Sequence, residues 1–332
     1  MTYQPPYTIT PEILNQVASI CELLGQLTQI TRQSNSLRLR RINRIRTIHG
    51  SLAIEGNTMS EAQISAILEG KRVIAPPREV QEVKNALAAY DRFENWDPHS
   101  PADLLDAHRI LMSGLIDELG RNRSSGVGVM TGQLVIHMAP PSERVPQLMQ
   151  DLFAWLATTD IHPLLASSIF HYEFEFIHPF ADGNGRMGRL WQSLILANWN
   201  PLFANMPVES LIFEHQADYY RAIKQSSDRA DSGPFIAFML KMIWNTLTTS
   251  TPEAAPEATP EVRLLYAMQG EMSRLQLKTA LGLKDDEHFR KAYLVPALAK
   301  GWIEMTLPQK PRSPNQKYRI SKEGQKIVAH LG

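Results

Sequence analysis

The sequence has little cysteine, no excess of charge of either sign and no long apolar run. Its single cysteine, Cys21, excludes a disulfide within the chain, and the apolar neighbours Ile20, Leu23 and Leu24 indicate a buried thiol rather than a nucleophile. The 34 basic and 34 acidic residues balance, so net charge does not direct the protein to nucleic acid or to a membrane. No apolar run reaches membrane-spanning length and no signal pattern opens the chain, so we expect a cytoplasmic protein with no membrane partner.

Alternation of polar and apolar residues is also scarce in the first 248 residues. Helix-start signals are present instead, namely Thr10-Pro11, the capping box Ser60-Glu61-Ala62-Gln63, and Ser100-Pro101. With 332 residues, 43% of them hydrophobic, the chain can bury a sizeable core and form two domains. We therefore predict a mainly α fold. The predicted divisions are a helical region at 1–100, a core at 101–248, a linker at 249–260 and a second module at 261–332.

The most informative stretch is His178 to Arg189, which reads His-Pro-Phe-Ala-Asp-Gly-Asn-Gly-Arg-Met-Gly-Arg. Apolar residues recur at helical spacing on both sides of it, so the stretch should join two core helices. It would then open a helix N-terminus, where amides without helical partners and the helix dipole favour an anion such as phosphate. The flanking apolar positions are Leu165, Ile169, Tyr172 and Phe176 upstream and Leu190, Leu194 and Ala197 downstream.

Residue types within this stretch suit a nucleotide. Gly183 and Gly185 allow positive φ and close backbone approach, so their amides and the Asn184 side chain can point at phosphate oxygens. Arg186 and Arg189 lie on one helix face and supply forked donors for further phosphates.

Two other residues complete the candidate site. Asp182 offers the single carboxylate that Mg²⁺ commonly uses together with phosphate oxygens. His178 is a candidate base, because the pKa of histidine lies near neutral pH. The alternative is purely structural: His178-Pro179 ends one helix, Asp182-Gly183 makes a turn and Asn184 caps the next helix.

The stretch resembles the Fic family signature, His-Pro-Phe-x-Asp/Glu-Gly-Asn-Gly-Arg-x-x-Arg, at every specified position. The resemblance implies transfer of AMP from ATP to a protein hydroxyl, with release of pyrophosphate and with Mg²⁺ as cofactor. It makes His178 the base and Asp182 the Mg²⁺ ligand. Asn184 and the glycine amides would form the anion hole, and the two arginines would hold the β- and γ-phosphates. The set of expected nucleotide-binding residues is Gly183, Asn184, Gly185, Arg186, Gly188 and Arg189.

A second element precedes this signature. Ile45, Ile48, Leu52 and Glu55 step by three, four and three, which places a carboxylate on an apolar helix face close to the helix C-terminus. The dipole disfavours a negative charge there, and burial requires a cationic partner. A local ion pair or a solvated helix end is the alternative. The candidate local partners are Arg38, Arg40, Arg41, Arg44 and Arg46.

The segment Ser51 to Gly56 also resembles the Fic inhibitory motif, Ser/Thr-x-x-x-Glu-Gly/Asn. That resemblance implies that Glu55 pairs with Arg189 and keeps the γ-phosphate from docking productively, with Ser51 as the first residue of the motif. The chain would then belong to the class whose inhibitory helix precedes the Fic core.

Two further segments bear on substrate binding. Residues 128–138 predict a hairpin with its turn at Thr131-Gly132, either an ordinary surface hairpin or the Fic flap, which would receive a target segment as an added strand and direct its hydroxyl to His178. His137 in this hairpin is expected to pack or face solvent. Tyr219 and Tyr220 stand where Fic proteins place aromatics beside the base, and they either stack on adenine or pack in a helix.

The C-terminal module predicts helices at 262–268, 273–281 and 285–300 and strands at 302–306 and 317–320, an order that resembles a winged helix-turn-helix. Residues 261–332 hold 13 Lys and Arg against 7 Asp and Glu, which favours DNA, whereas the acidic run 285–287 favours a protein partner.

The expected fold is thus a Fic-fold helical bundle with a β-hairpin flap plus a winged-helix domain. The expected activity is a protein adenylyltransferase. A nucleotide-sensing DNA-binding regulator, another nucleotide donor, self-modification and a homodimer remain open.

Overall fold

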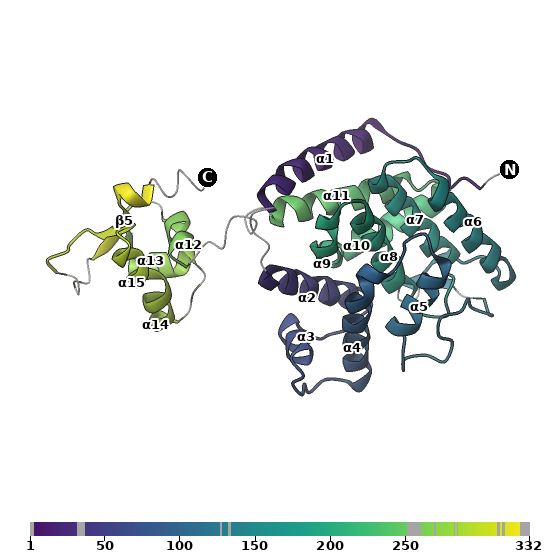
Figure 1. Cartoon of the computed structure of the whole chain (residues 1–332), viewed down its shortest axis with the longest axis horizontal. Coiled ribbons are helices and arrows are strands. Elements are labelled where there is room, and N and C mark those ends of the chain that lie inside the picture. The colour runs from purple at the N-terminus through teal and green to yellow at the C-terminus, as the bar shows by residue number, and fades with distance from the viewer. Residues whose placement is uncertain are drawn as a thin grey trace. The chain divides into compact units, whose positions relative to one another are not determined.

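The computed structural model describes residues 3–31, 37–126, 128–131, 134–250, 260–268, 270–281, 283, 285–310, 313 and 316–325. The chain divides into two compact units, Met1–Ser250 and Thr251–Gly332 (Figure 1). Helices account for most of the first unit, so the predicted mainly α fold is confirmed. Among the described residues, no helix is both long and apolar enough to cross a membrane.

The first unit is a bundle of helices with one hairpin. Its helices are α1 (Pro11–Thr31), α2 (Leu37–Ile54), α3 (Glu61–Leu68), α4 (Pro77–Arg92), α5 (Pro101–Leu111), α6 (Val145–Thr158), α7 (Pro163–Ile177), α8 (Asn184–Trp199), α9 (Val208–Glu214), α10 (Gln216–Arg229) and α11 (Gly233–Ser250). The hairpin consists of β1 (Gly128–Thr131) and β2 (Leu134–Met138).

Local signals explain several helix starts. The Ser60 side chain accepts a hydrogen bond from the Gln63 amide, and the Gln63 side-chain oxygen accepts one from the Ser60 amide, which completes the predicted capping box of α3. The Ser100 side chain caps α5 by accepting from the Asp103 amide, and Pro101 occupies the first turn, where a missing N–H costs nothing.

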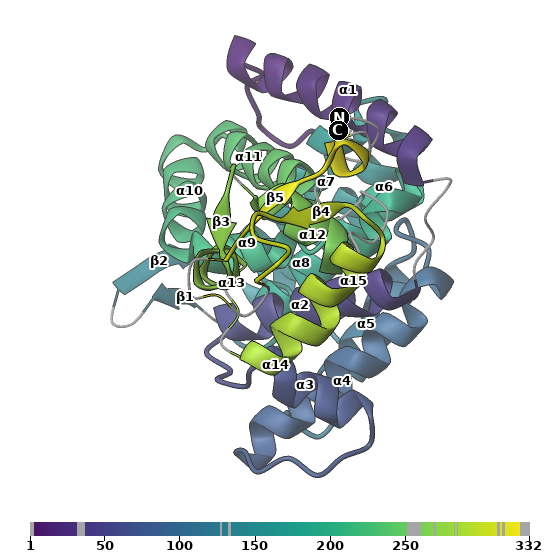
Figure 2. The ribbon, with the colours of Figure 1, turned by 90° about the vertical axis from the view of Figure 1, so that its left-hand side faces the viewer.

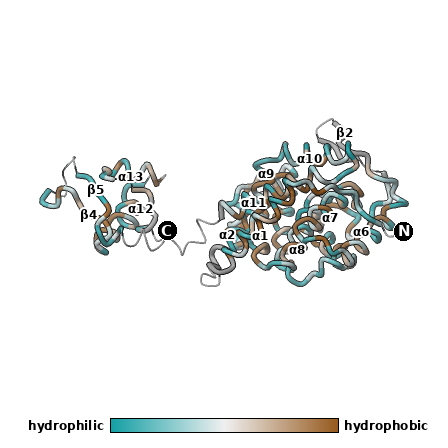
Figure 3. The backbone as a smooth tube through the Cα atoms, turned by 90° about the horizontal axis from the view of Figure 1, so that it is seen from above, coloured by the Kyte–Doolittle hydropathy of each residue, from teal (hydrophilic) through white to brown (hydrophobic). Residues whose placement is uncertain are grey.

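The core forms around α7 and α8, which pack against each other. Nearly every residue of α7 is buried, including Ile169, Phe170 and Phe174 at no more than 1% exposure. Helices α6 and α11 pack against α7, and Figure 3 shows hydrophobic residues along α7, α8 and α11. A loop joining α7 to α8 is therefore held on both sides by the most buried part of the unit.

The hairpin contacts the helical bundle through β2 and α10, at the edge of the unit (Figure 2). Its strands pair antiparallel, Gly128 with Met138 and Thr131 with Leu134, and a bulge interrupts the register between Val129 and Met130. Part of the predicted turn, Gly132, lies outside the described residues.

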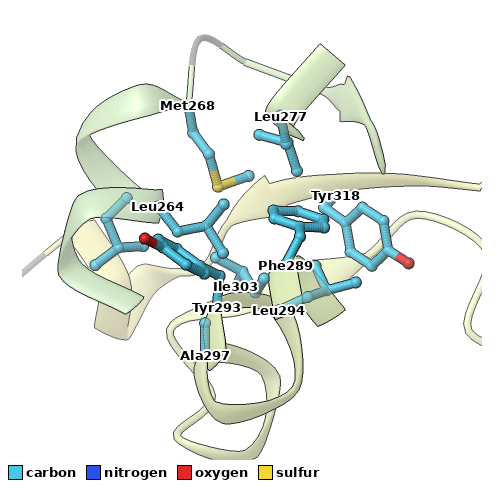
Figure 4. Packing of buried hydrophobic residues seen from close by; sticks show 10 residues of the cluster. Leu264, Met268, Leu277, Phe289, Tyr293, Leu294, Ala297, Ile303 and Tyr318 are labelled. Atoms are coloured by element: carbon cyan, nitrogen blue, oxygen red, sulfur yellow. The ribbon is translucent and has the colours of Figure 1, made fainter. Parts of the chain in front are cut away.

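The second unit has its own small core. Its elements are α12 (Pro260–Ala267), β3 (Met272–Ser273), α13 (Arg274–Ala280), α14 (Asp286–His288), a π-helix (Phe289–Leu294), α15 (Val295–Ala299), β4 (Ile303–Met305) and β5 (Lys317–Ile320). The helices bury Leu264, Leu277 and Phe289 against Ile303 and Tyr318 of the sheet (Figure 4). The sheet order is β3-β5-β4, so the predicted helices and two strands are present, and β3 is an additional strand too short to detect from the sequence.

Candidate active site

The loop between α7 and α8 has an unusual backbone. His178 ends α7 in the left-handed region with φ 51°, and Gly183 precedes α8 with φ 85°. Within the described residues, Ala230 is the only other non-glycine residue with positive φ. A non-glycine residue in this region costs about 1–3 kcal/mol and persists only where surrounding contacts enforce it. The loop must therefore be held from outside.

Arg123 is one of the groups that hold it. Its Nε donates to the His178 carbonyl at 2.7 Å, and its amide donates to the Pro179 carbonyl at 2.8 Å. The same guanidinium donates to the carbonyl oxygens of Ser125 and Pro140, at 2.7 and 2.6 Å. Because Ser125 and Pro140 flank the hairpin, the 2% exposed Arg123 joins the base of the hairpin to the His178 loop.

His108 of α5 holds the other end of the loop. Its Nδ1 accepts from the Gly120 amide at 3.0 Å, which leaves Nε2–H to donate to the Asp182 carbonyl at 3.0 Å. The imidazole stacks on Phe180 with ring centroids 3.7 Å apart. Burial lowers the pKa of His108 to about 4, against the Asp182 bond that raises it, so the ring is neutral at pH 7. Sequence reasoning identified neither Arg123 nor His108, because their partners lie 55 to 74 residues away.

The Asn184 side chain, which the sequence assigns to phosphate, bonds the backbone of the loop in this structure. Its Oδ1 accepts from the Phe180 amide at 2.9 Å and its Nδ2 donates to the Phe180 carbonyl at 2.8 Å. Both polar groups are thus satisfied within the protein, and the residue is 2% exposed. The first turn of α8 still presents its amides, because Met187 donates the bond back to the Gly183 carbonyl. These backbone amides are candidate anion ligands, and a contact of Asn184 with phosphate stays a prediction.

His178 itself stands at the mouth of this loop, with its side chain 19% exposed. Its Nδ1 lies 3.9 Å from Glu175 Oε2 on the last turn of α7. Burial lowers the pKa of His178, and the Glu175 carboxylate opposes that shift. The imidazole is thus neutral at pH 7 and can accept a proton.

Asp182 is the carboxylate of the loop, and 43% of its side chain is exposed to solvent. Its Oδ1 accepts from the Gly183 amide at 2.6 Å, and its two oxygens lie 3.3 Å from Arg186 Nη2 and 3.4 Å from Arg78 Nη2. The described residues contain no cluster of three or more metal-ligating side chains. One exposed carboxylate beside an anion site still fits Mg²⁺, which takes its other ligands from phosphate oxygens and water.

Glu55 pairs with Arg189, from α2 to α8. Glu55 Oε1 accepts from Arg189 Nη2 at 2.7 Å, while Ser51 accepts two bonds from the same guanidinium, at Oγ (3.2 Å) and at its carbonyl (3.0 Å). The Arg189 side chain is 1% exposed and that of Glu55 is 33% exposed. Burial alone would lower the pKa of Arg189, but Glu55 outweighs it and raises that pKa, so the ion pair is charged.

The alternative that Glu55 pairs with an arginine near it in the sequence is excluded for Arg41 and Arg44, which have other partners. Arg41 pairs with Glu69 at 2.7 Å, and Arg44 pairs with Asp91 at 2.6 Å. The end of α2 is fixed by α10, because Gln216 Nε2 donates to the Ile54 carbonyl at 2.7 Å. The carboxylate is therefore built into the site rather than left at a frayed helix end.

Arg186 is held in a similar way by a residue that the sequence did not single out. Its Nη1 lies 3.5 Å from Glu82 Oε1 on α4, and Glu82 Oε2 accepts from Asn57 Nδ2 at 2.8 Å. Arg186 is only 5% exposed. Each arginine of the signature thus faces a carboxylate from the N-terminal helices.

The glycines of the signature differ in their surroundings. A Cβ on Gly185 would collide with Glu55 Oε1 and lie 3.0 Å from Arg189 Nη1, so this position belongs to the site. A Cβ on Gly188 would lie 2.8 Å from the His171 ring and 3.0 Å from Glu175 Oε1. Gly188 thus lets α8 approach α7 closely, and its role in nucleotide binding stays a prediction.

The two tyrosines of α10 also separate. Tyr219 is 1% exposed and bonds His171 Nε2 through its hydroxyl at 3.1 Å, so its ring offers no face to a nucleotide and the packing alternative holds for it. Tyr220 is partly exposed and stays the candidate for stacking on a base.

Basic residues of the second unit are partly neutralised by acidic neighbours. Asp286 pairs with Arg274 at 2.8 Å and with Lys278 at 2.9 Å, and Lys291 pairs with Glu287 at 2.7 Å. These pairs reduce the positive field at the start of the third helix.

Two family profiles match the chain. The Fic/DOC family profile matches residues 98–196, and the profile described as "Filamentation induced by cAMP protein Fic-like, C-terminal domain" matches residues 260–321. The chain is 53% identical to a Fic family protein from Desulfovibrio desulfuricans G20 whose crystal structure is known, over 96% of this chain and 99% of that chain, with a TM-score of 0.75.

Curated relatives carry an activity in their names. "Protein adenylyltransferase Fic" of Nematostella vectensis is 30% identical over 212 residues, 60% of this chain and 47% of that protein. "Protein adenylyltransferase fic-1" of Caenorhabditis elegans is 29% identical over 235 residues, 67% of this chain and 44% of that protein. The chain thus spans about half the length of the curated relatives that it matches.

Proposed function

The chain belongs to the Fic family, and we propose that it is a protein adenylyltransferase that transfers AMP from MgATP to a Ser, Thr or Tyr hydroxyl and releases pyrophosphate. The observation that carries the proposal is the position of His178, a neutral base at one end of a loop whose other end is the anion-binding first turn of α8. The names of the curated relatives support the same activity.

The proposed reaction follows from this arrangement. His178 takes the proton of the target hydroxyl, whose oxygen bonds the α-phosphorus of ATP while the bond to the β-phosphate oxygen breaks. Pyrophosphate carries the leaving electron pair. The backbone amides of α8, together with Arg186 and Arg189, stabilise the charge on the phosphates.

Asp182 is the residue that would hold Mg²⁺ in this reaction. When bound, Mg²⁺ neutralises phosphate charge and orients the phosphate chain. Asp182 would then exchange its contacts with Arg78 and Arg186 for the metal, which frees Arg186 for phosphate.

Glu55 serves as an inhibitory residue in this proposal. Arg189 is already occupied by Glu55 and Ser51, so a γ-phosphate that needs the same guanidinium must displace a charged, partly buried partner. The protein would therefore be slow until Glu55 is moved or removed.

The target protein would bind along the hairpin β1–β2. An added strand could pair with a hairpin edge, and Arg123 links the base of the hairpin to the His178 loop. Residues 261–332 are proposed as a winged-helix module that selects the target, with DNA as the other candidate partner.

Mass spectrometry of a lysate incubated with MgATP tests the proposal. Purified wild type, Glu55→Gly and Glu55→Gly/His178→Ala proteins are compared for adenylate groups on Ser, Thr and Tyr. We expect strong modification only with Glu55→Gly. Equal modification by the double variant would refute the role of His178. If a modified protein is found only when another nucleoside triphosphate is supplied, that nucleotide and not ATP is the donor.

A further inference from the structure

Beneath His178 lies a buried carboxylate to which the reaction above assigns no role. We propose that Glu175 is a positioning residue for His178: its carboxylate faces Nδ1, keeps the proton on that nitrogen and leaves Nε2 free to accept the hydroxyl proton. This inference rests on the proposed function for its consequence, but not for the contact itself.

The geometry singles out this pair. Glu175 is one helical turn before His178, its side chain is 7% exposed, and its Oε2 lies 3.9 Å from His178 Nδ1. His178 Nδ1 and Glu175 Oε1 are buried polar atoms that make no hydrogen bond of ordinary geometry, and the Glu175 backbone acts on the His178 ring beside the carboxylate. Such atoms are costly unless they are satisfied, and catalytic hydrogen bonds are often long before substrate binds. A small rotation of the imidazole would close the gap.

Glu175 is ionised where it stands. Burial alone would raise its pKa, but His171 and His178 of α7 and its C-cap, together with Arg189 of α8, outweigh burial and hold that pKa below its ordinary value. The charged groups that act on His178 are Glu175, Arg123 and Glu55, and the nearest carboxylate to Nδ1 is that of Glu175.

The close approach of α8 explains why the carboxylate stays in this position. A Cβ at position 188 would lie 3.0 Å from Glu175 Oε1, so Gly188 provides the space that the carboxylate occupies. His171, fixed between Gln192 Oε1 at 2.5 Å and the Tyr219 hydroxyl, closes the other side. The carboxylate therefore lies between two histidines, with Oε1 3.7 Å from His171 Nε2 and Oε2 3.9 Å from His178 Nδ1.

The consequence concerns proton transfer. As Nε2 takes the hydroxyl proton, the imidazole becomes an imidazolium with its positive charge next to the Glu175 carboxylate. The proton stays on Nε2, and Glu175 neither gains nor loses one. Removing the carboxylate should weaken His178 as a base and release its orientation.

Glu173 supplies a matched control on the same helix. It is also buried, at 5% exposure, but it accepts from the Tyr3 hydroxyl at 2.6 Å instead of facing His178. If Glu175 only ties α7 to α8, then Glu175→Gln and Glu173→Gln should differ in stability, but neither should change the pKa of His178.

The experiment measures His178 directly. Full-length Glu55→Gly protein, labelled with ¹³C and ¹⁵N histidine and without nucleotide, is titrated by NMR, and His178 is assigned from the His178→Asn spectrum. We expect neutral His178 to carry its proton on Nδ1, and its pKa to fall by about one unit in Glu175→Gln but not in Glu173→Gln. A neutral form protonated on Nε2 in the parent protein overturns the proposal, whether or not Glu175→Gln folds.

Kinetics provide the second readout. Glu175→Gln should lower kcat for AMP transfer about tenfold or more, with KM for ATP changed less than about twofold, and should move the acidic limb of the rate profile to lower pH. An unchanged pKa and profile in Glu175→Gln would refute the positioning role. If the expected NMR shifts occur but the parent transfers no AMP, the Glu175 contact stands and the proposed function fails.

Discussion

Removal of the Glu55 carboxylate should raise the rate of the proposed AMP transfer. Glu55 Oε1 and Arg189 Nη2 are 2.7 Å apart, and the guanidinium has almost no exposure to solvent while the carboxylate is one-third exposed. Breaking a fully buried ion pair costs about 3–5 kcal/mol, and an exposed pair contributes about 0–1 kcal/mol. A half-buried pair should lie between these values.

We therefore expect Glu55 to disfavour productive docking of the γ-phosphate in bound ATP by about 1.5–3 kcal/mol, which corresponds to a rate increase of roughly ten- to a hundredfold in Glu55→Gly. Glu55→Gln keeps a side chain that can still accept from Arg189 but carries no charge, so its rate should fall between those of wild type and Glu55→Gly. Initial rates at saturating MgATP on one acceptor measure both effects.

Arg189→Ala distinguishes two effects: freeing the Arg189 guanidinium from Glu55, and removing that guanidinium altogether. It removes the partner of Glu55 and the phosphate ligand together, so its rate should stay low, and the double variant with Glu55→Gly should resemble it. Equal initial rates for wild type and Glu55→Gly would show that the ion pair is structural only.

Four other outcomes follow from the site and from the division of the chain. His178→Ala should abolish transfer but leave ATP affinity within a few-fold, as measured by calorimetry, because the base acts on the hydroxyl; a matching loss of affinity would contradict this. Since burial lowers the pKa of His178, the rate of Glu55→Gly should fall only as pH drops below the ordinary histidine value of about 6.5, and a midpoint above it would contradict the shift. Asp182→Ala should lose activity because it removes the proposed Mg²⁺ ligand. Activity of the Asp182→Ala protein, or of its parent in excess chelator, would argue against the metal role. A chain ending at Ser250, the limit of the first compact unit, should still modify itself or a generic acceptor; a folded but inactive truncation would make the second unit part of the active architecture.

The location of the site was predictable because its signals are local. Apolar positions at helical spacing on both sides of the run 178–189 indicate a loop between two core helices, and the structure has α7 and α8 there. The match to the Fic signature needed only the order of residues along the chain. Pairing of Glu55 with Arg189 followed from a second such motif, and the structure contains that ion pair.

Other contacts could not be predicted from the sequence because they depend on where side chains point. Asn184 and Gly188 are residue types that suit phosphate, yet one bonds the backbone of Phe180 and the other makes room for Glu175. The contacts that hold the loop are long-range, from Arg123 and His108, and neither residue lies in a motif. Spacing along the chain carries no information about such contacts until the helices have packed.

Transfer of label from two differently labelled forms of ATP distinguishes AMP transfer from phosphate transfer. Glu55→Gly protein is incubated with a lysate and with ATP labelled either at the α-phosphate or at the γ-phosphate, and the labelling by the lysate alone is subtracted, because its protein kinases transfer the γ-phosphate. We expect the added protein to increase label from the α-phosphate and not label from the γ-phosphate, and His178→Ala in the same background to increase neither. An increase in label from the γ-phosphate, or no increase from either position, would refute AMP transfer by this protein.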